Sequence, residues 1–327
     1  MAEITYLDAI HQAIDEEIAR DPDVFVLGED VGAFGGAFKV TAGLQARHGA
    51  LRVLDTPLST SAIVGAAIGA ALMGMRPIVE LQFSDFVAGA FDQIVNMAAK
   101  LSWRTNGEMP ASLVIRGPTG GGTRSGPWLS QSPEAWLAHV PGLKVVVPST
   151  AYDAKGLLKA AIRDDDPVLY LEHKLLYRRL KGEVPADDYV VPLGRAAVRR
   201  EGRDLTIFTY GAMVYQALAA ADRLERETGK RAEVVDLRSL APLDRNAIAA
   251  SVRKTNRVLL LHEDTRRGGI GGEVAALIAE DLFNHLDAPI VRVAGADTPF
   301  PYAPTLEAAY LPNAEQVIVA ARRLLAY

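Results

Sequence analysis

The chain has 327 residues, of which 49% are hydrophobic and 23% charged, so it has the balance of an ordinary globular protein and enough length for two domains. Its formal net charge of -5 gives no electrostatic footprint for nucleic acid or an anionic membrane, and no apolar run reaches the ~18 residues of a membrane span. The absence of cysteine excludes disulfides, thiolate nucleophiles and Cys-ligated metals, and it fits a cytoplasmic protein.

Strand-like apolar runs alternate with helical patterns along the chain, after an acidic amphipathic helix expected over residues 1–21. This alternation predicts an α/β fold with open, mostly parallel sheets. The strands expected in the first half are 24–28, 77–83, 111–116, 143–148 and 167–172. The helices expected between them are 61–73, 91–101 and 151–162.

A polar, proline-bearing connector at 181–188 separates this half from a second α/β unit. The strands expected there are 204–210, 231–237, 257–262 and 289–293, and the helices are 214–228, 244–254 and 271–284. We therefore expect a first domain over 1–185, a linker over 186–203 and a second domain over 204–327.

Two glycine-rich segments interrupt these elements. Residues 117–126 follow a strand and could expose backbone N–H groups to an anion, but they lack the ending of a P-loop. The wall of an active-site channel and a plain surface loop are the alternatives. Residues 268–273 begin a helix, and their glycines indicate a close contact between helix and strand.

Histidines and carboxylates give few local signals. The six histidines show no i, i+3 or i, i+4 pairs, so a metal site built from sequence-adjacent ligands is not expected. No Gly-x-Ser-x-Gly elbow supports a serine hydrolase. Glu29 and Asp30 follow a strand, at the edge where open α/β sheets bind ligands, although capping of the next turn explains them equally well.

Several segments spread over the whole chain share one pattern: 27–32, 55–58, 82–86, 130–135, 141–148 and 297–302. Together they resemble the beta subunit of the thiamine diphosphate-dependent 2-oxo acid dehydrogenases, a branch of the transketolase-like superfamily. The resemblance implies a pyrimidine-binding domain followed by a transketolase-type C-terminal domain. Residues 172–174 and 181–189 lean towards the branched-chain type.

The resemblance also assigns residues to the cofactor. Leu58 and Gln82 would line the pocket for the aminopyrimidine ring, and Phe86 would pack on its face. An aromatic contact of this kind is worth ~1 kcal/mol beyond its burial. Ordinary core packing is the alternative for Phe86.

The implied division of labour leaves the diphosphate and magnesium to a partner, because the chain has no Gly-Asp-Gly motif. The expected assembly has two alpha and two beta chains, with the second domain serving assembly and docking to a lipoyl acyltransferase core. Carbonyls near Ala161, Asp164 and Asp166 are candidates for a monovalent cation such as potassium.

Two positions depart from the family pattern. Thr60 stands where the family has a glutamate that hydrogen-bonds a pyrimidine nitrogen and promotes loss of the thiazolium proton. A threonine hydroxyl is no acid–base partner near neutral pH, and loss of such a group typically costs ~10²–10⁴-fold in rate. Glu29 is a candidate to reach the ring from another strand. Leu129 stands where the branched-chain pattern has a histidine that assists acyl transfer to lipoyl.

Three interpretations of these departures stay open. The chain is a subunit of an enzyme with redirected chemistry, such as a carboligase that needs no lipoyl acceptor. Or it is an inactive beta-like subunit kept for assembly or regulation. Or it is a conventional dehydrogenase subunit whose two side chains were replaced by engineering or whose missing roles are met by other groups. We expect a cofactor-binding subunit that decarboxylates a 2-oxo acid, with Thr60 and Leu129 weakening or redirecting the reaction.

Overall fold

The computed structural model describes residues 2–327, which form two compact units. The first unit comprises residues up to 119 together with Trp136–Leu193, and the second comprises Gly120–Ala135 with Gly194–Tyr327. Both units are α/β structures with mostly parallel sheets, as the alternating pattern predicts. The chain therefore passes from the first unit into the second at residue 120 and returns to the first at residue 136.

The sheet of the first unit runs in the order β6-β7-β5-β4-β2-β3, and every one of these neighbours pairs in parallel. The bounds are β2 (Val24–Gly28), β3 (Val53–Asp55), β4 (Arg76–Glu80), β5 (Val114–Thr119), β6 (Lys144–Val146) and β7 (Val168–His173). All residues of β2, β5 and β7 are buried, which is typical of parallel strands covered on both faces.

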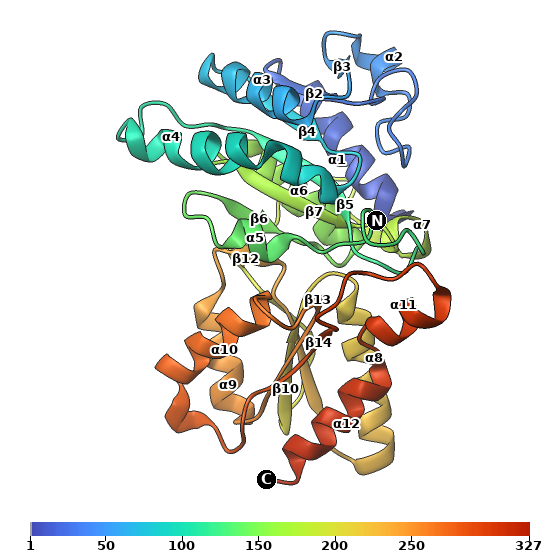
Figure 1. Ribbon diagram of the computed structural model, residues 1–327, viewed down its shortest axis with the longest axis vertical. Helices are drawn as coiled ribbons and strands as arrows, with labels where there is room; N and C mark the ends of the chain where they lie inside the picture. Colours follow the sequence, from blue (N-terminus) through green and yellow to red (C-terminus); the bar gives the residue numbers. More distant parts are fainter. Residues whose placement is uncertain (1) are drawn as a thin grey trace. The chain divides into compact units, whose positions relative to one another are not determined.

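The helices of the first unit include two long ones, α1 (Tyr6–Arg20) and α6 (Ala151–Arg163), which pack on each other. The others are α2 (Leu44–His48), α3 (Thr60–Leu72), η1 (Ser84–Ala90), η2 (Gln93–Ala98), α4 (Ala99–Arg104) and α7 (Leu176–Arg179), while α5 (Glu134–Ala138) begins in the second unit. In Figure 1, α3 and the helix that η2 and α4 form together lie on the side of the sheet turned to the viewer.

Two expected helices differ from the structure. The first residues form a strand, β1 (Ala2–Thr5), which pairs with β8 (Lys181–Val184). The helix begins only after it, because the Thr5 side chain accepts a hydrogen bond from the Asp8 N–H and caps α1. The single helix expected over 91–101 is a π-helical turn, η2, followed by α4.

The sheet of the second unit has five strands in the order β14-β13-β10-β11-β9. They are β9 (Ala197–Arg200), β10 (Leu205–Thr209), β11 (Ala232–Asp236), β13 (Val258–Thr265) and β14 (Val291–Gly295); β12 (Ser239–Ala241) is a further short strand. Only β9 is antiparallel, and it lies inside the range expected as a linker. β9 and β14 are the two edge strands of this sheet.

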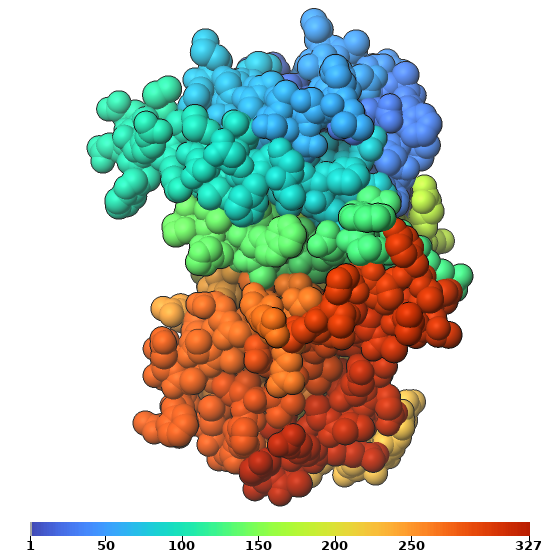
Figure 2. Space-filling view, in the orientation of Figure 1, coloured from blue at the N-terminus to red at the C-terminus, as the bar shows by residue number. Residues whose placement is uncertain are grey.

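The helices of the second unit are α8 (Met213–Thr228), α9 (Arg245–Thr255), α10 (Ile270–Asp281), η3 (Phe283–His285), α11 (Pro304–Tyr310) and α12 (Ala314–Leu325). The glycines that begin α10 lie against β13 as expected, since a β-carbon on Gly271 would lie 2.7 Å from the His262 ring. The terminal helix α12 forms part of the surface in Figure 2 and begins at a capping box made by Asn313 and Gln316.

Candidate cofactor site

The candidate site lies at one edge of the first unit's sheet, where β4, β2 and β3 are neighbours. Glu29 and Asp30 directly follow β2, and Gln82 comes shortly after β4. Because these strands are parallel, their carboxyl ends meet at the same edge. The Gln82 Nε2 atom lies 3.3 Å from Asp30 Oδ2 and donates to it, so two predicted site segments are brought together.

The loop after β2 is shaped by contacts that only glycine allows. The Gly32 N–H donates to Asp55 Oδ1 at 2.6 Å, and a β-carbon on Gly32 would lie only 2.3 Å from Asp55 Oδ2. Asp30 itself has a φ of 58°, and its carbonyl accepts from the Gly36 N–H at 2.7 Å. The loop is therefore held closely against the end of β3, next to the start of α3.

Glu29 and Thr60 occupy neighbouring positions at this edge. Thr60 is the first residue of α3, and the Glu29 carboxylate accepts a hydrogen bond from the backbone N–H of Ser59, the residue before it. Burial raises the pKa of Glu29, the charge of Asp30 raises it further, and the Ser59 hydrogen bond lowers it. A carboxyl group with a raised pKa thus lies beside the position where the family pattern has its glutamate.

Two apolar side chains of the site are turned outwards. Leu58 is 85% exposed and Phe86 is 39% exposed. Phe86 lies edge-on to Phe83, with ring centroids 5.8 Å apart. Phe86 is therefore no ordinary core residue. Uncovered apolar surface beside the hydrogen-bonding groups of Gln82 and Glu29 fits a flat heteroaromatic ring such as an aminopyrimidine.

A buried ionic network lies behind the edge, and sequence reasoning missed it. Arg116 on β5 donates to Glu80 on β4 and, through Nε at 2.5 Å, to Glu172 on β7, which also accepts from the Tyr177 hydroxyl at 2.6 Å. Burial raises the pKa of Glu80, Arg116 lowers it, and Glu172 raises it. The sequence does contain a signal that could have predicted this network, since each of the three apolar strands has one charged residue near its end.

Leu129 belongs to the second unit, within the segment 120–135. It is half-buried, and its N–H donates to the Gly126 carbonyl at 3.4 Å. The preceding Trp128 is 71% exposed and lies edge-on to Tyr302. The structure thus places the two departures from the family pattern, Thr60 and Leu129, in different units.

The glycine-rich loop that precedes Leu129 is tied down by carboxylates. The Gly121 N–H donates to Glu263 Oε1 at 2.5 Å, and the N–H groups of Gly122 and Arg124 donate to Glu307 Oε1 at 3.1 and 3.0 Å. These three amides are engaged by the protein itself. An anion-binding role for them, one of the interpretations of this loop, is wrong.

Two further carboxyl groups of the second unit, those of Glu134 and Asp264, have raised pKa values. The Tyr210 hydroxyl donates to Glu134 Oε1 at 2.8 Å. Burial raises the pKa of Glu134 to about 8, and the charge of Asp264 contributes to the increase. Burial likewise raises the pKa of Asp264 to about 6. Glu134 is therefore mostly protonated at neutral pH.

The candidate cation residues lie at the end of α6. The Asp164 N–H donates to the Ala161 carbonyl at 3.3 Å, and the Arg76 guanidinium donates to the Asp164 carbonyl. Lys144 Nζ lies 2.7 Å from Asp164 Oδ1 and 3.1 Å from Asp166 Oδ2. The side chains of Arg76 and Lys144 thus contact residues that the resemblance assigns to a monovalent cation.

Over residues 2–327, no cluster of three or more histidine or carboxylate side chains is arranged to hold a metal ion. The same part of the chain contains no helix with the length and apolar character needed to cross a bilayer.

Comparisons with known proteins identify the family. The description "Transketolase, pyrimidine binding domain" matches residues 2–179, and "Transketolase, C-terminal domain" matches 194–317. The chain is 55% identical to the 2-oxoisovalerate dehydrogenase subunit beta of Bacillus subtilis (strain 168), over 99% of both chains. It is 46% identical to the pyruvate dehydrogenase E1 component subunit beta of the same organism, over 100% of both.

A solved structure described as a split gene transketolase, inactive beta4 tetramer, has the same fold. It is 27% identical, covers 99% of this chain and 98% of its own, and superposes with a TM-score of 0.80. The chain belongs to the E1 beta subunits of the thiamine diphosphate-dependent 2-oxo acid dehydrogenases, within the transketolase-like superfamily.

Proposed function

We propose that this subunit binds the aminopyrimidine half of thiamine diphosphate and, with an alpha partner, decarboxylates a branched-chain 2-oxo acid such as 2-oxoisovalerate. The observation that carries the proposal is the grouping of Glu29, Leu58, Gln82 and Phe86 around one sheet edge. The substrate class rests on the 55% identity to a 2-oxoisovalerate dehydrogenase subunit, against 46% to a pyruvate dehydrogenase subunit.

The chain's own residues would divide the work at the ring. Phe86 and Leu58 supply apolar surface for its faces, and Gln82 supplies a hydrogen bond to its polar edge. When bound, the cofactor supplies the electron sink for loss of carbon dioxide from the 2-oxo acid. Glu29 is the carboxyl group beside Thr60 that can hold a proton there, because burial and the charge of Asp30 raise its pKa.

Thr60 and Leu129 limit this chemistry. A threonine hydroxyl does not ionise near neutral pH, so Glu29 is the carboxyl group left for acid–base work beside Thr60. Leucine can give no proton or hydrogen bond to an acyl-transfer step. We therefore propose a weakened dehydrogenase reaction. A carboligase and an inactive subunit are not favoured by the relatives, which are named as dehydrogenase subunits.

The relatives are named as beta subunits, and we propose that this chain likewise pairs with an alpha subunit, as two alpha and two beta chains. For this chain we propose that the alpha partner holds the diphosphate and magnesium through the Gly-Asp-Gly motif that this sequence lacks. Docking to a lipoyl acyltransferase core and a cytoplasmic location belong to the same proposal. A potassium ion near Ala161, Asp164 and Asp166 remains a prediction, and it would compete with the Arg76 contact.

The test is reconstitution of the chain with its alpha partner, thiamine diphosphate and magnesium, followed by an assay of 2-oxoisovalerate and pyruvate decarboxylation with an artificial electron acceptor. We expect turnover only with both chains, a preference for 2-oxoisovalerate, and a rate that rises in the Thr60→Glu variant. Turnover by the beta chain alone, or a rate that Thr60→Glu leaves unchanged, would contradict the proposal.

A further inference from the structure

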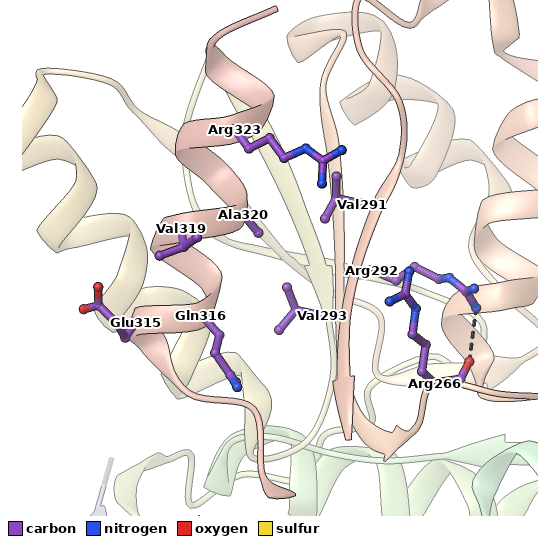
Figure 3. Close-up of a pocket in the computed structure, with 9 residues that line it drawn as sticks. All are labelled: Arg266, Val291, Arg292, Val293, Glu315, Gln316, Val319, Ala320 and Arg323. Atoms are coloured by element: carbon purple, nitrogen blue, oxygen red, sulfur yellow. Dashed lines mark hydrogen bonds between the residues drawn. The ribbon is translucent and has the colours of Figure 1, made fainter. Parts of the chain in front are cut away.

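A groove runs between β14 and α12 in the second unit, with a volume of about 410 Å³. Its apolar floor comes from Val291 and Val293 on the strand and from Val319 on the helix. The Val319 side chain is 61% exposed. Figure 3 shows Val291 and Val293 on the strand side of the groove and Val319 on the helix side. The volume lies within the range of sites that hold a bound group of about drug size.

The groove follows an open sheet edge. β14 stands at the end of the sheet order, and within residues 2–327 it pairs with β13 alone. Successive strand residues point to opposite faces of a sheet, yet Val291, Arg292 and Val293 all line the groove. The cavity therefore wraps the strand's free edge, where unpaired backbone groups are available to another strand.

The rim of the groove is positively charged. Arg266, Arg292 and Arg323 line it, and none of them pairs with a carboxylate among the described residues. The Arg292 Nη1 atom donates only to the Arg266 carbonyl, at 3.1 Å. The one acidic residue on the rim, Glu315, is engaged by Arg223 at 2.5 Å. Three guanidinium groups thus surround an apolar floor without counter-charges.

We propose that this β14–α12 groove binds an extended acidic peptide segment of a partner protein, which adds as a strand to the edge of β14. Backbone hydrogen bonds to the strand would supply affinity without sequence selectivity. Alternate apolar side chains of the peptide would lie on Val291, Val293 and Val319, and the intervening carboxylates would reach the arginines. The groove is built within the second unit, so the inference stands apart from the proposed cofactor site.

The probe is a capped peptide of alternating glutamate and valine, added to the full-length chain and followed by fluorescence anisotropy. We expect saturable binding that weakens as salt rises, because partly exposed charges are screened. The Arg292→Glu variant should raise Kd about tenfold or more, since a favourable charge contact becomes a repulsive one. Amide hydrogen exchange should slow at 291–295 when the peptide is bound.

Two controls separate this account from others. Arg253→Glu, on α9, replaces an exposed arginine that likewise pairs with no carboxylate among residues 2–327, and it should leave Kd unchanged. A peptide with lysine in place of glutamate should not bind. Equal binding of both peptides, or no response to Arg292→Glu, would overturn the proposal. Sedimentation in which Arg323→Glu dissociates a dimer without any peptide would overturn it too, because the occupant would then be a second copy of the chain.

Discussion

Thr60 and Glu29 carry the chemical question of this protein at the scale of single residues. The Glu29 carboxylate accepts a hydrogen bond from the Ser59 N–H and so lies beside Thr60. The site therefore has the carboxyl group of Glu29 near the position where the family pattern has a glutamate at residue 60. The sequence identifies both residues, because each lies in a segment with a recognisable pattern. It cannot show their closeness, which depends on β2 and β3 being neighbours in the sheet.

A second residue-scale prediction concerns acyl transfer. The Leu129→His variant of the reconstituted complex should speed acylation of a lipoyl domain by roughly 10²-fold, because a histidine restores general acid–base help. Decarboxylation measured with an artificial acceptor should stay unchanged. Quench-flow analysis of the lipoyl domain gives the first rate and a dye-reduction assay the second; an equal rise in both rates would contradict the assignment.

The buried network at Arg116 gives a stability prediction. Glu172→Ala removes one carboxylate from a guanidinium that is 1% exposed, and it orphans the Tyr177 hydroxyl. Breaking a buried pair by removing one partner typically costs about 3–5 kcal/mol. Urea unfolding should show a loss of that order, while the exposed control Glu108→Ala should change little. A loss below about 1 kcal/mol would mean that the network contributes little net stability.

At the scale of elements, apolar runs and glycine positions predict most of the central strands and long helices, including β2, β7 and α6. The short elements escape prediction. β1 and β8 exist only because they pair with each other across the first unit, and four-residue strands carry no period of their own. The π-helical turn η2 has ordinary helical composition, so its extra residue per turn leaves no mark in the sequence.

The buried carboxyl group of Glu134 predicts a pH dependence of stability. The pKa of Glu134 is 4.5 in a free side chain and about 8 in the folded chain, so the folded state binds more protons between these values. Its contribution to stability is fully present below about pH 4.5 and is lost as pH rises through about 8, with a slope approaching ~1.4 kcal/mol per pH unit. The Glu134→Gln variant should show a flatter fall of unfolding free energy over this interval. A parallel fall in both proteins would contradict it.

At the scale of the whole molecule, the segment 120–135 interrupts the first unit in sequence but belongs to the second in space. The sequence pattern does not predict that these residues belong to the second unit. The carboxylates that fix the loop, Glu263 and Glu307, lie 142 and 185 residues from their partners Gly121 and Gly122. No local pattern marks a pairing over such a separation, so it could be found only in the folded structure.

The packing of this loop gives a further prediction. A β-carbon on Gly121 would lie 2.1 Å from Phe300 Cζ, so Gly121→Ala forces the ring to move and should cost roughly 1–3 kcal/mol. Phe300→Leu leaves room for the added methyl group. The double variant should therefore be less destabilised than the sum of the two single changes, as a thermodynamic cycle from urea unfolding will show. Simple additivity would mean that the two residues do not press on each other.

We propose that Glu29 performs the proton transfer at a site that lacks the family's glutamate. Proton–deuterium exchange at the thiazolium carbon of thiamine diphosphate, in the complex with the alpha partner, tests this claim directly. The account predicts exchange faster than in free cofactor, a fall of about 10²–10⁴-fold in Glu29→Gln, and a rise in Thr60→Glu. Unchanged exchange in Glu29→Gln, with the Glu108→Gln control also unchanged, would contradict it.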